Sequence, residues 1–203
     1  MDLFNQSNEI SNLLPKNGTV FHYGFAFSKL ISDKLYTTFL ESIVWKNDEA
    51  IMYGKRIVTD RKIAWYGENT SNYFHPKIGK EVAPFTNDLL EVKKEIENIT
   101  GETYNSCLLN LYHNGSEGIS WHSDGEDYFK KNGAIASVTF GAERKFAFKH
   151  KDTKEVVSLI LQHGSLLVMK NETQTYWLHS LPPTKKVHRP RISLTFRTIE
   201  LPS

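Results

Sequence analysis

Two segments of the N-terminal half place apolar residues at the spacing of an amphipathic helix. The first is SKLISDKLYTTFLESIVW (28–45), in which Ser28 can cap the N-terminus because its hydroxyl accepts a hydrogen bond from the first helical turn. The second is FTNDLLEVKKEIENITGE (85–102). Thr86 or Asn87 is expected to cap it, and Gly101 to end it. Its apolar stripe consists of Leu89, Val92 and Ile96.

The pattern changes from helices to strands at Ser106. The short strand candidates that follow are separated by Gly, Asn, Asp and Pro: CLLNLY, AIASVTFG, RKFAFKHK, EVVSLILQ, SLLVMK, TQTYWLHS and PRISLTFRTI. So many short strands predict a barrel or a two-sheet sandwich. We therefore expect an α+β fold with helices packed against an antiparallel β core, in one domain over residues 1–203. The core is expected over about 106–199, and a loose N-terminal segment over about 1–20.

Composition and charge narrow the class of protein without naming a function. Hydrophobic residues make up 39% of the 203 residues and charged residues 24%, which is ordinary for a soluble globular domain. The net charge of +2 does not demand a polyanionic partner. Cys107 is the single cysteine, so no internal disulfide can form and a reducing compartment is expected. The first ten residues do not read as a signal peptide, and no apolar run reaches membrane-spanning length. We expect a cytoplasmic monomer, nuclear if the source is eukaryotic.

A histidine and an aspartate at i and i+2 raise the possibility of a metal site. His122 and Asp124 in GISWHSDGEDYF project to the same side of an extended segment, because strand side chains alternate with a period of two. His179, at the end of TYWLHS, is the best third ligand, and two histidines with one carboxylate suit non-haem Fe(II). Taken alone, the pair is also compatible with a surface turn, and His179 with a half-buried histidine. A second copy of the pattern, His150-Lys151-Asp152, is predicted to be a solvated hairpin turn.

Two strand candidates near the C-terminal half have one apolar and one polar face. In PRISLTFRTI, Ile192, Leu194 and Phe196 alternate with a polar set. The pattern fits either a surface strand or the wall of a pocket, where two arginines suit a dicarboxylate ligand. In LLNLY an amide and a phenol share one face in the same way. The polar residues of the two strands are Arg191, Ser193, Thr195 and Arg197, and Asn110 and Tyr112.

Five features in a fixed order resemble the AlkB family of Fe(II)/2-oxoglutarate dioxygenases, particularly the members that repair alkylated duplex DNA. The resemblance runs from about Phe21 to Thr198, and its features are MYGKRIVTDRKIAWYGE (52–68), N-x-Y at 110–112, H-x-D at 122–124, His179 and R-x-x-x-T-x-R at 191–197. It implies a double-stranded β-helix, or jelly roll, with the N-terminal helices packed on one sheet. It also implies a nucleotide-recognition lid over about 46–80, and the cofactors Fe(II), 2-oxoglutarate and O2.

The resemblance also assigns roles to individual residues. His122, Asp124 and His179 would be the catalytic iron ligands. Arg197 would hold the distal carboxylate of 2-oxoglutarate and Arg191 would sit near its metal-chelating end. The other residues expected to bind this cosubstrate are Asn110, Tyr112, Ser193 and Thr195, with Ser193 standing where the family usually has Asn. Those expected to contact the substrate are Tyr53, Arg61, Tyr66 and Glu126.

The function implied by the resemblance is oxidative dealkylation of N-alkylated bases in DNA, with RNA as a second candidate, and release of formaldehyde. The Watson–Crick edge of a paired base is hidden, so a lid that carries Tyr53 and basic residues would help to extrude the base. Two rival hypotheses remain from the sequence: an Fe(II)/2-oxoglutarate oxygenase acting on a protein or a small molecule, and a β-barrel binding module without enzymatic activity.

Overall fold

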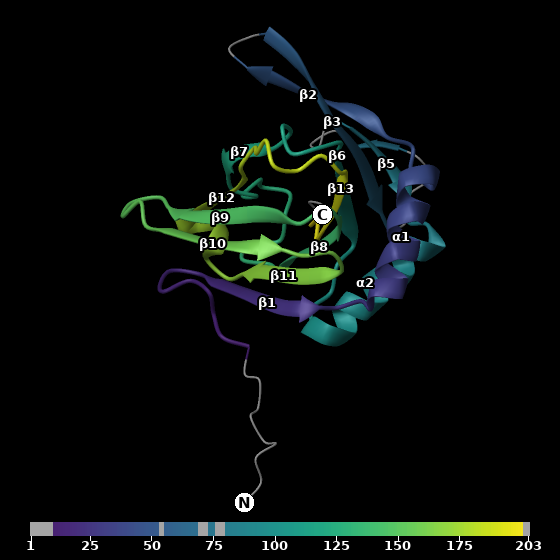
Figure 1. Cartoon of the computed structure of the whole chain (residues 1–203). Coiled ribbons are helices and arrows are strands. Elements are labelled where there is room, and N and C mark those ends of the chain that lie inside the picture. Colours follow the sequence, from purple (N-terminus) through teal and green to yellow (C-terminus); the bar gives the residue numbers. More distant parts are fainter. Residues whose placement is uncertain (1–9, 53–54, 69–72, 76–79, 201–203) are drawn as a thin grey trace, which may run out of the picture.

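The computed structural model describes residues 10–52, 55–68, 73–75 and 80–200. Two β-sheets face each other, and two helices cover the outer side of the larger sheet (Figure 1). Within the described residues, no helix is long and apolar enough to cross a membrane.

The larger sheet runs in the order β1-β11-β8-β13-β6-β3-β5-β4, with β2 paired to β3. The smaller sheet runs β10-β9-β12-β7. The strands of the larger sheet are β1 Thr19–Phe25, β2 Lys46–Met52, β3 Lys55–Gly67, β4 Tyr73–His75, β5 Lys80–Pro84, β6 Ser106–Tyr112, β8 Ile135–Gly141, β11 Ser165–Lys170 and β13 Arg191–Arg197. The strands of the smaller sheet are β7 Ile119–His122, β9 Arg144–His150, β10 Val156–Leu161 and β12 Trp177–Leu181.

Both predicted helices are confirmed, together with their caps. In α1 (Lys29–Ser42) the Ser28 side chain accepts a hydrogen bond from the N–H of Ile31. In α2 (Asn87–Thr100) Thr86, rather than Asn87, is the cap, and it accepts from the N–H of Leu89. Gly101 ends α2 in the left-handed conformation, φ 70°, which a residue without a Cβ adopts at low cost. The predicted stripe of α2 is fully buried: Leu89, Val92 and Ile96.

Alternation along the strands of the larger sheet creates two separate interiors. On β6 and β13 the apolar residues face α1 and α2 and form the main core with Phe39 and Phe140. The opposite face of these strands looks into the space between the two sheets. There it meets a second apolar cluster, built around Phe148 and Trp177 of the smaller sheet. The polar face of β13 is therefore enclosed, which excludes the surface-strand interpretation.

Two details of the predicted organisation are corrected. The segment TQTYWLHS is not one strand, because Thr173–Tyr176 form the short helix α3 and β12 begins only at Trp177. The N-terminal segment, expected to be loose over about 1–20, packs on the larger sheet in its described part, which begins at residue 10. Leu14 is buried at 3% exposure, and β1 adds an edge strand to the larger sheet by pairing with β11. The antiparallel pair β2–β3 extends beyond the sandwich, in the region expected to form the lid (Figure 1).

Candidate functional site

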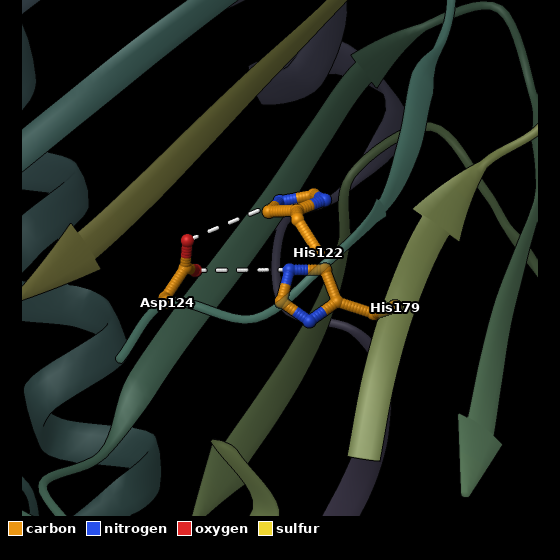
Figure 2. Close-up of side chains that lie close together, drawn as sticks. All are labelled: His122, Asp124 and His179. Atoms are coloured by element: carbon orange, nitrogen blue, oxygen red, sulfur yellow. Dashed lines mark ion pairs between the residues drawn. The ribbon is translucent and has the colours of Figure 1, made fainter. Parts of the chain in front are cut away.

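His122 and His179 come together because their strands are neighbours. β7 and β12 pair antiparallel in the smaller sheet, and His122 lies directly opposite His179 in the register. Both imidazoles project into the space between the sheets, and their ring centroids are 4.2 Å apart. Asp124 follows two residues after the end of β7 and turns its carboxylate toward both rings (Figure 2). The Nε2 atoms of His122 and His179 lie 3.9 and 3.7 Å from the two carboxylate oxygens.

These three side chains fit a metal ion by chemistry as well as by position. Their candidate ligand atoms all lie within 4.8 Å of one another. The Nδ1 atom of His122 lies 2.8 Å from the carbonyl oxygen of Ser120, which can only accept a hydrogen bond. Nδ1 therefore carries the proton, and Nε2 presents its lone pair to the site. Two imidazoles and one carboxylate with open space beside them form the donor set preferred by non-haem Fe(II).

The electrostatics of the site keep its ligands in metal-binding form. Burial by itself would raise the pKa of Asp124, but the positive charge of Arg197, with smaller effects of the two histidines, lowers it to about 2. Burial lowers the pKa of His179 to about 3, against the opposing attraction of Asp124. At neutral pH the aspartate is therefore ionised and His179 is neutral, which are the forms that coordinate a divalent cation.

A cavity of about 330 Å³ opens beside the three side chains, between the two sheets. Its walls come from β3, β6 and β13 on one side and from β7, β9 and β12 on the other. All six residues predicted to bind the cosubstrate line this cavity: Asn110, Tyr112, Arg191, Ser193, Thr195 and Arg197. The sheet register explains this gathering, because Arg191 is opposite Tyr112 and Ser193 is opposite Asn110.

Arg191 is a buried cation at the end of this cavity, and none of the described residues forms an ion pair with it. Its side chain is 2% exposed, and one terminal nitrogen donates to the hydroxyls of Thr139 at 2.9 Å and Ser193 at 3.4 Å. Its Nε has no hydrogen-bond partner. Burial lowers the pKa of Arg191 to about 10, and the guanidinium remains charged at neutral pH. Since an unpaired buried charge is costly, this position fits the carboxylate of a ligand.

The two arginines of β13 occupy the reverse of their expected places. Arg197 donates from its terminal nitrogen to Asp124 at 2.8 Å, so it lies at the metal end of the cavity. Arg191 lies six residues earlier on the same strand, about 20 Å along it, at the end away from Asp124. The expectation that Arg197 holds the distal carboxylate is therefore wrong. A strand pattern places both arginines on one face, but it does not say which end of the strand is near the metal ligands.

Comparison with known proteins identifies the family. The model of the 2OG-Fe(II) oxygenase superfamily matches residues 19–197. DNA oxidative demethylase ALKBH2 of Bos taurus is 36% identical over 188 residues, which are 87% of this chain and 68% of that protein. The human protein of the same name is 40% identical over 158 residues, 74% of this chain and 60% of its own length. The chain belongs to the AlkB family of Fe(II)/2-oxoglutarate dioxygenases.

Two further relatives of this AlkB family member support the family and the fold. Alpha-ketoglutarate-dependent dioxygenase alkB homolog 3 of Bos taurus is 35% identical over 178 residues, 83% of this chain and 62% of that protein. The solved structure of OsALKBH1 superposes with a TM-score of 0.63, covering 91% of this chain and 98% of that one. At 13% identity this likeness speaks for the fold alone, and it confirms the predicted jelly roll.

The cavity is lined by two of the residues that were expected to contact the substrate, Arg61 and Glu126. Arg61 lies 14% exposed, forms an ion pair with Asp48 and stands 6.0 Å from the ring centroid of Tyr112. Glu126 is exposed and lies in the loop after β7, where it also lines the cavity. Tyr53 lies outside the described residues.

The expectation that Tyr66 lies at the mouth of the site is wrong. Tyr66 is 6% exposed and packs in the core between the larger sheet and the helices. Arg61 and Tyr66 are five residues apart on β3, and an odd separation puts two side chains on opposite faces of a regular strand. The aromatic residue on the Arg61 face is Trp65, which lines the cavity and donates from Nε1 to Ser106 Oγ at 2.6 Å.

Tyr66→Phe is expected to leave turnover unchanged while lowering stability slightly. Burial raises the pKa of Tyr66, and its hydroxyl hydrogen-bonds to the main chain of Val44 on the helix side of the sheet. Loss of that bond should lower the free energy of unfolding by about 1 kcal/mol. Urea denaturation and kcat/KM on a methylated oligonucleotide would measure the two effects. A large rise in KM for the oligonucleotide would mean that Tyr66 contacts the substrate after all.

Besides Trp65, the sequence reasoning missed several cavity residues, among them Phe146, Tyr128 and Asp48. Phe146 on β9 stacks on His179 with ring centroids 5.6 Å apart, and Tyr128 lines the wall near Glu126. Asp48 lies at an irregularity in the β2–β3 register, where it pairs with Arg61. The alternation Arg61, Ile63, Trp65 could have pointed to Trp65. No local signal marks Asp48, because its role depends on a partner 13 residues away.

The second His-x-Asp pattern is a hairpin turn, as expected, but its histidine is not solvated. β9 ends at His150 and β10 begins at Val156. Asp152 is exposed, whereas His150 is 3% exposed and its ring lies 5.0 Å from that of Trp177. His150 accepts hydrogen bonds at Nδ1 from the N–H groups of Asp152 and Thr153, so it closes the turn.

Proposed function

We propose that this protein is an Fe(II)/2-oxoglutarate-dependent oxidative demethylase or dealkylase that repairs N-alkylated bases in DNA, with RNA as a second candidate substrate. The observation that carries the proposal is one cavity with a two-histidine, one-carboxylate set beside it and an unpaired buried guanidinium at its far end. Relatives named DNA oxidative demethylase support the choice of nucleic acid as substrate.

His122, Asp124 and His179 would hold the iron, and the cavity would hold 2-oxoglutarate beside it. Arg191 would bind the distal carboxylate, since it offers a charge and an unpartnered Nε there. Asn110 and Tyr112 would orient the chain of the cosubstrate from the neighbouring strand. When bound, the metal and 2-oxoglutarate supply, with dioxygen, the oxidising power that hydroxylates the N-alkyl carbon.

The overall reaction balances with one oxygen atom of O2 in succinate and the other in the released aldehyde. For an N-methyl base, 2-oxoglutarate loses carbon dioxide and becomes succinate, while the hydroxylated methyl group leaves as formaldehyde. The N–C bond breaks and the ring nitrogen is restored. No side chain acts as a nucleophile in this scheme.

The remaining residues would position groups and exclude water. Arg197 keeps Asp124 ionised and oriented through their 2.8 Å contact. Ser193 and Thr195 line the cosubstrate cavity, and Ser193 helps to hold the Arg191 guanidinium. Phe146 covers His179 and limits access of water to the metal position. At the mouth, Arg61 and Glu126 would contact the extruded base, with Trp65 as a wall.

A base inside a duplex has to leave the stack to reach such a cavity, at a cost of a few kcal/mol that a lesion reduces. We propose that the β2–β3 region is part of a nucleotide-recognition lid over about 46–80, including Tyr53. Exposed Lys185, Lys186 and Arg189 in the loop before β13 could add phosphate contacts.

We also propose that the chain acts as a single-domain monomer, cytoplasmic, or nuclear in a eukaryote.

The proposal is tested by turnover on a panel of methylated oligonucleotides, single- and double-stranded. The protein would be loaded without oxygen with Fe(II) and 2-oxoglutarate and then exposed to air. The expected result is loss of one methyl group by mass, with succinate formed in equal amount. Binding to the same oligonucleotides should weaken as salt rises, because phosphate contacts release counterions.

The rival function is oxygenation of a protein or small molecule by the same metal centre. It predicts succinate formation that no methylated oligonucleotide stimulates, and no oligonucleotide binding even at low salt. That pair of results would contradict the proposed substrate and leave the metal chemistry in place. The third hypothesis, a binding module, predicts no succinate under any of these conditions.

A further inference from the structure

Asp124 is the one member of the three-residue set that no strand holds. β7 ends at His122, and its pairing with β12 ends at the His122–His179 pair. Residues 123–126 have no regular structure. The strand ladder therefore fixes the two histidines relative to each other, but it cannot fix the main chain that carries the carboxylate.

The side chain of Gln174 supplies a hydrogen bond to Asp124 where strand pairing is absent. Its Oε1 accepts a hydrogen bond from the main-chain N–H of Asp124 at 2.8 Å. Its Nε2 faces the sulfur of Met169 at 3.6 Å, a weak acceptor that favours this orientation of the amide. Among the hydrogen bonds of the described residues, the bond that the Asp124 N–H donates to Gln174 is the one that holds the main chain of Asp124.

Gln174 lies on a rigid support that leads directly to His179. It belongs to α3, whose first residue, Thr173, is 1% exposed. The Thr173 hydroxyl accepts from the N–H of Thr19 at 2.8 Å and bonds to the carbonyl of Lys170 at 2.7 Å. α3 is thus tied to β1 and β11, and β12 begins directly after it. The hydrogen bond that Gln174 accepts therefore sets the position of the Asp124 loop relative to the strand of His179.

The hydrogen bonds of Lys151 and a nearby cavity indicate that polar contacts, among them the Asp124–Gln174 hydrogen bond, hold the loop, rather than packing. Lys151 donates to the carbonyl of Gln174 at 2.9 Å and reaches the hydroxyl of Ser123 at 3.4 Å. A cavity of about 460 Å³ lies on this side of the loop and is lined by Ser123, Asp124 and Gln174. Close packing does not fill the space behind the carboxylate, so polar contacts have to fix its position.

We propose that Gln174 is a positioning residue of the metal centre: it holds the main chain of Asp124 so that the carboxylate, which Arg197 orients, lies at the distance from His179 that one ion requires. This inference rests on the proposed function, because it assumes the metal site at His122, Asp124 and His179. Outer partners that orient a metal ligand typically contribute about 10- to 100-fold to metal affinity or activity.

The test is Gln174→Met, which keeps the length of the side chain and its contact with Met169 but removes the amide oxygen. Mn(II) would be titrated into the metal-free protein and bound metal followed by electron paramagnetic resonance. We expect the Kd for Mn(II) to rise by about 10-fold or more. We expect the melting temperature of the metal-free protein to change no more than in the control variant Gln162→Met. Gln162 is half-buried in a turn, and its side-chain amide makes no hydrogen bond among the described residues.

The outcomes separate this inference from the proposed function. If His122→Ala loses Mn(II) binding while Gln174→Met binds it as the wild type does, the metal site stands and the inference is wrong. A lower melting temperature for Gln174→Met with unchanged metal affinity would assign Gln174 a purely structural role and also overturn it. If His122→Ala binds Mn(II) normally, the metal site itself is wrong.

Discussion

His122→Ala is expected to abolish turnover on methylated oligonucleotides and to leave the fold intact. His122 supplies one of three proposed metal ligands, and its side chain is 37% exposed, so little packing is lost. Since loss of an outer partner already costs about 10- to 100-fold, loss of a direct ligand should exceed that and bring succinate formation below detection. Turnover by mass spectrometry and the melting temperature of the metal-free protein are the two measurements.

The matched control is His188→Ala, which removes an exposed histidine from the loop before β13. It should keep wild-type turnover and wild-type stability. An active His122→Ala variant would mean that the ligand set has been assigned wrongly. Loss of activity together with a fall of many degrees in melting temperature would instead point to a structural role for this histidine.

Arg191→Met is expected to weaken 2-oxoglutarate binding by about 30- to 4,000-fold. The estimate follows from the 2–5 kcal/mol that truncation of a buried, hydrogen-bonded charge pair typically costs. Without the cosubstrate, the same change replaces an unpaired buried cation by an apolar side chain. The melting temperature of the ligand-free protein should therefore stay constant or rise. The measurements are KM for 2-oxoglutarate and the rise in melting temperature that 2-oxoglutarate causes.

Arg144→Met provides the contrast for Arg191→Met. Arg144 is buried to the same 2% exposure, but its guanidinium donates to four main-chain carbonyls in the loops before β7 and after β12. Its loss should lower the free energy of unfolding, because buried carbonyls are left without donors. If Arg191→Met destabilises the ligand-free protein like Arg144→Met and leaves KM for 2-oxoglutarate unchanged, Arg191 is a structural arginine.

Local periodicity was sufficient for the elements whose stabilising contacts lie nearby in the sequence. The stripe Leu89, Val92 and Ile96 and the cap at Thr86 predicted α2, because a helix buries one face and needs acceptors at its first turn. Strand alternation likewise predicted that Asn110 and Tyr112 share a face. It failed at TQTY, where the hydroxyl of Thr173 hydrogen-bonds to the N–H and the carbonyl of Thr19, 154 residues away, and so stabilises a helical turn.

The order of motifs in the sequence pointed to the family and to the residues near the metal, but local pattern did not fix their arrangement. Tyr66 was placed on the wrong side because two neighbouring aromatic residues on a strand differ only in which face is enclosed. The expected positions of Arg191 and Arg197 were exchanged because the strand direction relative to the candidate metal ligands is set by the pairing of two sheets. Gln174 carries no motif at all, since its partner Asp124 is 50 residues away.

The sequence by itself therefore determined α1 and α2, most strands, the polar faces of β6 and β13 and the identity of the candidate ligands. These depend on side-chain spacing and on interactions within one element. Only the tertiary structure decided which polar face is enclosed, which arginine lacks a partner and what holds the carboxylate loop. Those properties depend on burial and on partners brought from distant segments, and both exist only once the two sheets have closed on each other.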